Sequence, residues 1–182
     1  MKDSLRLKLR ERRSALSQSS YTEKSASIRG KLESLKEFKK SKKILLYVST
    51  DEEVDTKALI KDCLKIGDSV FVPKVIKDSL AICKIDTWED LKPGNFGILE
   101  PCEIISNIHP SEMDLIVVPG IGFDLKGHRI GYGKGFYDRL LKQTNGFKVG
   151  LAFEEQILHC IPSKEHDVPL DLIITDKHIF RF

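Results

Sequence analysis

The stretch LIVVPG, residues 115–120, is the most strand-like segment of this 182-residue chain. Four consecutive apolar residues, three of them β-branched, are typical of a strand buried on both faces of a parallel sheet. Pro119 and Gly120 end the run, because both residues interrupt regular structure. A similar apolar run occupies residues 44–48, which we expect to form a neighbouring strand.

Helical patterns alternate with these strands. Leucines at 5, 9 and 16 predict an amphipathic helix over residues 3–16. Ser20 and Glu23 predict a capping box that opens a second helix ending near Phe38. Further helices are expected at residues 56–66, ended by Gly67, and at 136–143. Further strands are expected at 70–72, 80–82, 149–153 and 172–175, and residues 88–110 and 120–135 are expected to be loops. This alternation predicts a layered α/β fold with a largely parallel sheet, in one domain spanning residues 1–182.

Composition excludes several classes of protein. No run of about 18 apolar residues is present, and the charged start does not resemble a secretory signal, so neither a membrane partner nor secretion is expected. A net charge of +3 is too small to predict a nucleic-acid partner. The basic first helix lacks the interleaved aromatics of an RNA-binding module. The four cysteines form no C-x-x-C pair, which favours free thiols in a reducing compartment over a zinc site.

Four glycines fall within residues 127–135, beside Arg129 and Lys134. Glycine lets the backbone approach a ligand closely, so that successive N–H groups can converge on phosphate oxygens. The spacing fits neither a Walker loop nor the dinucleotide fingerprint. Two interpretations stay open on spacing alone: an anion-binding loop, or a long connection with tight turns.

Six ordered motifs resemble the 5-formyltetrahydrofolate cyclo-ligase family, also called methenyltetrahydrofolate synthetases. They are the basic pair Lys2 and Arg6, EVDT at 53–56, FGILEP at 96–101, PGIGFD at 119–124 with GHRIGYGKGFYD at 127–138, AFEEQ at 152–156 and HDVPLD at 166–171. Many family members have arginine in place of Tyr132 and tyrosine in place of Phe136. The resemblance implies a three-layer αβα sandwich of the NagB/RpiA/CoA-transferase-like type.

The resemblance also implies a reaction and its site. ATP and Mg²⁺ would drive conversion of 5-formyltetrahydrofolate to 5,10-methenyltetrahydrofolate, with the formyl oxygen attacking the γ-phosphate and N10 closing the ring. Lys134 and Arg129 would be catalytic. The nucleotide would be bound by Lys2, Arg6, Arg129, Ile130, Gly131, Tyr132, Gly133, Lys134, Gly135, Phe136 and Tyr137. The folate would be bound by Val48, Glu53, Phe136 and Tyr137, and Mg²⁺ by Asp138, Asp167 and Asp171.

Each of these roles has an ordinary structural alternative. Lys2 could belong to a frayed terminus, and Asp138 could be a first-turn carboxylate that faces a helix dipole. Asp167 and Asp171 could serve in turns, Val48 and Phe136 in the core, and Glu53 as a solvated charge. Trp88 could line the folate site or anchor a surface loop. We expect a monomeric cytoplasmic enzyme; a paralogue with a different substrate and a non-catalytic nucleotide- or folate-binding regulator are the competing hypotheses.

Overall fold

The computed structural model describes residues 2–94, 97–102, 108–163 and 167–182. Within these residues, the largest sheet has seven strands in the order β12-β11-β9-β6-β1-β2-β3. The five strands from β11 to β2 pair in parallel, and the edge strands β12 and β3 are antiparallel to their neighbours. The predicted mostly parallel sheet is therefore confirmed. The strands are β1 (Lys43–Leu45), β2 (Ser69–Ile76), β3 (Ser79–Ile85), β6 (Leu115–Val118), β9 (Phe147–Leu151), β11 (Leu172–Ile174) and β12 (Ile179–Arg181).

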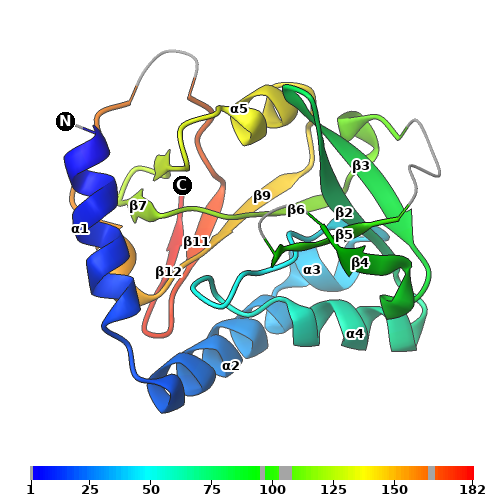
Figure 1. Ribbon diagram of the computed structural model, residues 1–182, viewed down its shortest axis with the longest axis horizontal. Helices are drawn as coiled ribbons and strands as arrows, with labels where there is room; N and C mark the ends of the chain where they lie inside the picture. The colour runs from blue at the N-terminus through cyan, green and yellow to red at the C-terminus, as the bar shows by residue number, and fades with distance from the viewer. Residues whose placement is uncertain (1, 95–96, 103–107, 164–166) are drawn as a thin grey trace.

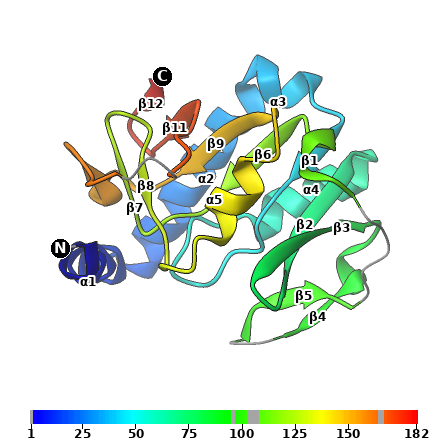
Figure 2. The same ribbon diagram turned by 90° about the horizontal axis from the view of Figure 1, so that it is seen from above.

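Helices cover the two faces of this sheet unequally (Figures 1 and 2). One face packs against α2 (Gln18–Ser34), α3 (Lys36–Lys40) and α4 (Lys57–Ile66), through a cluster that includes Ile28, Phe38 and Ile60. The opposite face packs against the short helix α5 (Phe136–Leu141), through Leu140 and Leu141. The second helical layer is therefore one six-residue helix, supplemented by a small sheet.

Two segments expected to be loops contain short strands. Residues 88–110 include η1 (Trp88–Asp90) and the antiparallel pair β4 (Leu91–Pro93) and β5 (Leu99–Pro101), and the following turn is η3 (Pro110–Glu112). The glycine-bearing segment contains β7 (Gly122–Asp124) and β8 (Arg129–Ile130), which join β10 (Ile157–Leu158) in a three-stranded sheet. These strands have two or three residues each, which is too short for a periodic sequence signal.

The expected helices are present, with different boundaries at the second one. The first, α1, spans Lys2–Ser14. The N-cap of α2 is Ser17, whose hydroxyl accepts the N–H of Ser20, so the predicted capping residue lies inside the helix. Leu35 is extended (φ −63°, ψ 138°) and divides the predicted second helix into α2 and α3. Gly67 ends α4 in the left-handed conformation, as predicted.

The strand order places a ligand-binding crevice. Chain segments β1–α4–β2 and β6–α5–β9 run in opposite directions from the adjacent strands β1 and β6. Ligands of open α/β sheets bind outside the carboxyl ends of the strands at such a switch point. Here, those ends are followed by residues 46–56 and by the glycine-bearing segment.

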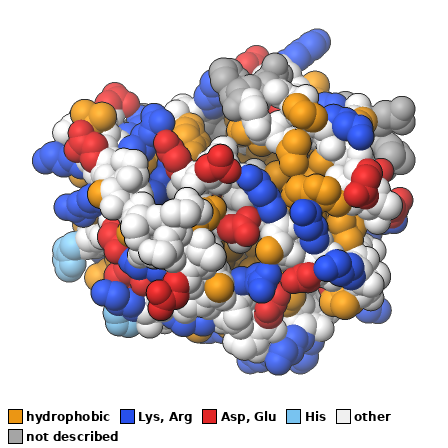
Figure 3. Space-filling model, turned by 60° about the horizontal axis from the view of Figure 1, so that its bottom comes forward, with side chains coloured by type: hydrophobic (Ala, Val, Ile, Leu, Met, Phe, Trp, Pro, Cys, Tyr) orange, Lys and Arg blue, Asp and Glu red, His pale blue; other side chains and the backbone are white. Residues whose placement is uncertain are grey.

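Basic and acidic side chains are intermixed over the face of the molecule shown in Figure 3. None of the helices in the described part of the chain is long and apolar enough to cross a membrane.

Candidate functional site

A cavity of about 1120 Å³ lies at the carboxyl ends of β1 and β6. Its walls come from α1, the segment after β1, the glycine-bearing segment with α5, the β2–β3 hairpin and β5. Fifteen predicted site residues line it: Lys2, Arg6, Val48, Glu53, Arg129, Ile130, Gly131, Tyr132, Gly133, Lys134, Gly135, Phe136, Tyr137, Asp138 and Asp167. Residues far apart in the sequence thus meet at the switch point.

Asp171 is the predicted site residue that lies elsewhere. It directly precedes β11, whereas the cavity lies at the carboxyl ends of the parallel strands. Its Oδ2 accepts the backbone N–H of Lys148 at 2.7 Å and pairs with Lys148 Nζ at 2.8 Å. Asp171 therefore lies apart from the other predicted site residues, and its contacts with Lys148 fix the start of β11 beside β9.

The glycine loop, residues 131–135, follows β8 and leads into α5. Gly133 and Gly135 have φ of 101° and 64°, a region that side chains other than glycine rarely adopt. Arg6 of α1 donates from Nε to the carbonyl of Gly131 at 2.9 Å. Its guanidinium also lies over Gly133, where an added Cβ would be 3.4 Å from Nη2. Helix α1 therefore contacts the glycine loop through Arg6.

Three cations of α1 line the cavity at a spacing of four residues, which places them on one helix face: Lys2, Arg6 and Arg10. Lys2 Nζ pairs with Asp167 Oδ2 at 2.9 Å, so the predicted phosphate ligand and the predicted metal ligand contact each other. Lys134 projects from the glycine loop and is exposed. Within the described residues it contacts the Phe136 ring, 5.7 Å from Nζ to the centroid, and has no carboxylate partner. Its charge is thus available to an anion.

Arg129 is buried and is already paired at both ends of its guanidinium. Nη1 donates to the carbonyl of Val168 at 3.0 Å, and Nη2 donates to Asp138 Oδ1 at 2.8 Å. The same carboxylate oxygen accepts the N–H of Val168 at 3.3 Å. Arg129 therefore fixes Asp138 and the segment at Val168, and a direct contact with phosphate would require these bonds to change.

The carboxylates fit a metal ion that arrives with a phosphate ligand. Asp138 and Asp167 both line the cavity, and each pairs with a cation. No group of three or more His, Cys, Asp or Glu side chains that could hold a metal occurs in the part of the chain that the structure describes. Mg²⁺ is commonly held by one or two carboxylates together with phosphate oxygens and water. The donor set matches that arrangement.

Glu53 lines the cavity after the carboxyl end of β1 and is 8% exposed. Its Oε2 accepts the Thr50 N–H at 3.0 Å, and its Oε1 accepts the Tyr132 hydroxyl at 3.2 Å. Burial, followed by the nearby Glu53, raises the pKa of Tyr132 above its ordinary value. The phenol is therefore a neutral donor that links the glycine loop to Glu53.

Aromatic and aliphatic side chains complete the site. Val48 is a buried core residue that also lines the cavity, and Phe136 is half-buried between Lys134 and Arg139. The Tyr137 hydroxyl is buried without a partner among the described residues, and burial raises the Tyr137 pKa far above its ordinary value. Trp88 lies outside the cavity lining and packs under Lys61, 4.5 Å from Nζ to the ring centroid.

Sequence reasoning missed part of the lining. Arg10 carried a detectable signal, since it follows Arg6 by four residues in an amphipathic helix. The apolar wall carried a partial signal, since Ile98 and Leu99 belong to the FGILEP motif but had no assigned role. Pro73, Val75 and Leu80 carried none, because the β2–β3 hairpin brings them to the cavity from a distant segment. Motif residues Phe96 and His166 lie outside the described residues.

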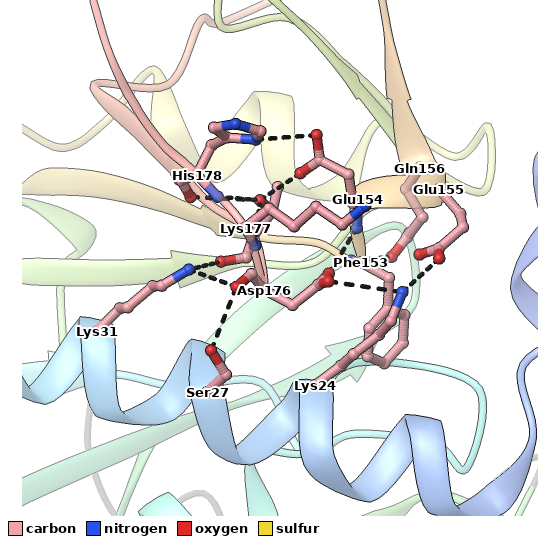
Figure 4. Close-up of polar contacts among 11 residues, drawn as sticks. Lys24, Ser27, Lys31, Phe153, Glu154, Glu155, Gln156, Asp176, Lys177 and His178 are labelled. Carbon is pink, nitrogen blue, oxygen red and sulfur yellow. Dashed lines mark hydrogen bonds and ion pairs between the residues drawn. The ribbon is translucent and has the colours of Figure 1, made fainter.

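The AFEEQ motif, residues 152–156, contacts the segment that follows β6. Gln156, in η4 (Glu154–Gln156), donates to the carbonyls of Gly120 and Ile121 at 3.0 Å each. Figure 4 shows its neighbours Glu154 and Glu155 in a polar cluster with Lys24 of α2 and Asp176 of the β11–β12 turn. The motif therefore joins the glycine-bearing segment, α2 and the sheet edge.

Comparisons with known proteins identify the family of this chain. The 5-formyltetrahydrofolate cyclo-ligase family profile matches residues 1–176. The mouse protein named 5-formyltetrahydrofolate cyclo-ligase is 32% identical over 95% of this chain and 92% of its own length. The Haemophilus influenzae protein of the same name is 37% identical over 76% of this chain and 78% of its own.

A solved structure agrees as well. The Aquifex aeolicus 5,10-methenyltetrahydrofolate synthetase has a TM-score of 0.89 and 39% identity, covering 99% of this chain and 92% of that protein. The Mycoplasma pneumoniae synthetase has a TM-score of 0.79 and 29% identity, over 96% and 98% of the two chains. The chain belongs to the 5-formyltetrahydrofolate cyclo-ligase family, whose members are ligases.

Proposed function

We propose that this protein uses ATP and Mg²⁺ to convert 5-formyltetrahydrofolate to 5,10-methenyltetrahydrofolate, releasing ADP and phosphate. The observation that carries the proposal is a single cavity in which a cationic glycine loop and the buried Glu53 face one space. That cavity lies at the switch point of the seven-stranded sheet. The family to which the chain belongs is named for this reaction.

The phosphates of ATP would lie between the glycine loop and the first turns of α1. Lys134 has an exposed ammonium group, and Arg6 and Lys2 reach the same cavity from α1. Backbone N–H groups of Gly131, Gly133 and Gly135 would supply further donors, as in other phosphate-binding nests. Ile130, Tyr132, Phe136 and Tyr137 would complete the nucleotide contacts. Arg129 would act by fixing Asp138, with which it pairs at 2.8 Å.

Asp138 would hold Mg²⁺ through the oxygen that Arg129 does not contact, and Asp167 is the second carboxylate within the cavity. The ion would neutralise phosphate charge when the nucleotide is bound. Arg129 keeps Asp138 in one orientation, so the carboxylate is pre-positioned before the metal arrives.

The folate would bind against Glu53, Val48, Phe136 and Tyr137. A pterin has N–H groups that a carboxylate can accept and flat faces that aromatic rings cover. The apolar wall from the β2–β3 hairpin and β5 offers a surface for the rest of the substrate. With the two ligands in one cavity, the formyl oxygen would attack the γ-phosphate, N10 would close on the activated carbon, and phosphate would leave. This chemistry needs positioning and charge neutralisation rather than a protein nucleophile.

Four further expectations belong to the proposal. The chain would act as one domain over residues 1–182 and as a monomer, since the described cavity is lined by this chain. It would work in the cytoplasm, which agrees with its four free cysteines. Helices on both sheet faces are compatible with a relation to the NagB/RpiA/CoA-transferase-like folds.

Calorimetric titration with each ligand tests the two ends of the cavity separately. Lys134→Ala should weaken ATP binding and spare 5-formyltetrahydrofolate, whereas Glu53→Gln should do the reverse. If both variants bind both ligands as the unmodified protein does, the assignment of the site is wrong.

A further inference from the structure

Arg13, in the last turn of α1, is a buried guanidinium beside the cavity that the proposed chemistry does not use. Arg13 is 3% exposed, and its Nη2 contacts Glu52 Oε2 at 2.7 Å. The remaining nitrogens, Nε and Nη1, are buried and have no hydrogen-bond partner among the described residues. Burying a cation with incomplete pairing is unfavourable, so its presence here calls for a compensating role.

The neighbours of Arg13 are groups of the proposed folate end. Glu52 lines the cavity next to Glu53, and Arg10 also approaches Glu52, at 3.9 Å. Arg13 lies close enough to Tyr132 to oppose the increase in the Tyr132 pKa that burial and Glu53 cause. Tyr132 in turn donates to Glu53 Oε1 at 3.2 Å. Arg13 thus contacts Glu52 and Tyr132 contacts Glu53, so both side chains hold two consecutive residues of the segment after β1.

Tyr132 is largely exposed to solvent, but its hydroxyl is hydrogen-bonded. The residue is 55% exposed, yet its hydroxyl reaches a carboxylate that is 8% exposed. Without a fixed charge near that hydroxyl, the side chain would be free to rotate into solvent and leave Glu53 Oε1 unpaired. Arg13 supplies the fixed charge, since a packed helix face holds it near Leu9 in α1.

We propose that Arg13 is a positioning residue that, through Tyr132 and Glu52, holds the Glu53 carboxylate in the orientation that receives the folate. The inference rests on the proposed function, because it assigns Glu53 to the folate. Arg13 touches neither ligand. Its effect passes through Glu52 and through the Tyr132 hydroxyl, which contacts Glu53, so it should act on folate affinity more than on ATP affinity.

The test compares Arg13→Gln, Arg13→Lys, Tyr132→Phe and the Arg13→Gln/Tyr132→Phe double variant with the unmodified chain. Arg12→Gln is the matched control, since Arg12 is the adjacent cation and is exposed. Each protein is assayed for kcat and for the two KM values, and 5-formyltetrahydrofolate binding is measured directly by calorimetry. Thermal unfolding reports the folded fraction of each sample.

Arg13→Gln is expected to raise the folate KM and Kd by about tenfold, while the ATP KM changes by less than about twofold. Arg13→Lys should recover part of the loss, because it restores charge but not the planar fork. The double variant should bind folate with the same affinity as whichever single variant binds it more weakly, since the two substitutions disturb the same set of contacts. Arg12→Gln should leave both KM values unchanged.

Three results with the Arg13→Gln variant would overturn the proposal. Unchanged folate affinity in Arg13→Gln would remove the role, and so would equal increases in both KM values. A lowered active fraction with normal KM values would make Arg13 purely structural. If the unmodified chain binds 5-formyltetrahydrofolate but does not turn it over, the proposed reaction fails while the Kd comparison still decides the role of Arg13. If the unmodified chain does not bind this folate, both proposals fail.

Discussion

Nη2 of Arg129 lies 2.8 Å from Oδ1 of Asp138, so a residue expected at the phosphate and a residue expected at the metal contact each other. The pair also holds the backbone at Val168, through the Val168 carbonyl and N–H. These contacts hold one wall of the cavity in place. Pre-positioning of this kind lowers the cost of assembling a site on binding.

Loss of Arg129 should therefore destabilise the fold as well as the site. Arg129→Met removes the charged donor of a part-buried carboxylate and leaves the Val168 carbonyl without the donor it has here, which should lower the free energy of unfolding by about 2–3 kcal/mol. Urea denaturation measures the change. Lys126→Met is the control, because Lys126 is exposed in the same segment. Equal stability of the two variants would show that the pair contributes nothing.

Lys134→Ala tests the phosphate end of the cavity. Removing a charged donor to a phosphate should raise the ATP KM by about tenfold or more, with a smaller change in the folate KM. Steady-state kinetics with one substrate varied at a time gives both values. Lys126→Ala removes an equal charge from a residue outside the cavity lining and should leave both KM values as they are. A matching effect of the two variants would assign the loss to net charge alone.

Gly133 should tolerate a side chain less well than its neighbour Gly131. Gly133 has φ of 101°, and an added Cβ would meet Arg6 Nη2 at 3.4 Å, whereas Gly131 lacks a positive φ and has nothing within 4 Å of that position. Gly133→Ala should therefore cost about 1–3 kcal/mol of unfolding free energy, and Gly131→Ala less than about 0.5 kcal/mol. Chemical denaturation of both variants makes the comparison. The same cost at both positions would contradict the backbone argument.

Asp124 makes a pH-dependent contribution to stability. Burial alone would raise its pKa, but hydrogen bonds from the N–H groups of Ile161, His128 and Lys126 outweigh burial and hold the Asp124 pKa below its ordinary value. A carboxyl group whose pKa is lowered in the folded state stabilises the fold at pH values above its unfolded-state pKa, about 3.9. That stabilisation is lost as the pH falls through the folded-state pKa.

Asp124→Asn should accordingly lower the unfolding free energy by about 2–3 kcal/mol at neutral pH. The difference from the unmodified chain should narrow as pH falls below about 4. Denaturant titrations at several pH values give the curve. A difference that stays constant or widens toward acid pH would contradict the assignment of an ionised, hydrogen-bonded Asp124.

The sequence predicted the sheet better than the site's walls. Apolar runs such as residues 115–118 are local signals, and Gly67 is a local helix stop, so both were read correctly. The break at Leu35 had no local signal, since leucine favours helices; tertiary packing places it. Asp171 was grouped with the site because it belongs to the same sequence motif as Asp167. It precedes β11, however, whereas the cavity lies at the carboxyl ends of the parallel strands.

For the site, too, the sequence predicted which residues belong together but not the contacts between them. Fifteen of the sixteen predicted site residues line one cavity, because motif order carries that information. The contacts among them were invisible, since pairs such as Tyr132 with Glu53 join residues 79 positions apart. A sequence of side chains like Arg13, Tyr132 and Glu53 becomes apparent only when burial and geometry are known.

Turnover is the most direct test of the central claim. The protein is mixed with 5-formyltetrahydrofolate, ATP and Mg²⁺, and the absorbance of methenyltetrahydrofolate is followed, with ATP omitted in a parallel reaction. The account predicts product formation only when ATP is present, with one ADP released per product. Absence of ATP-dependent product from a folded sample that binds ATP would contradict it.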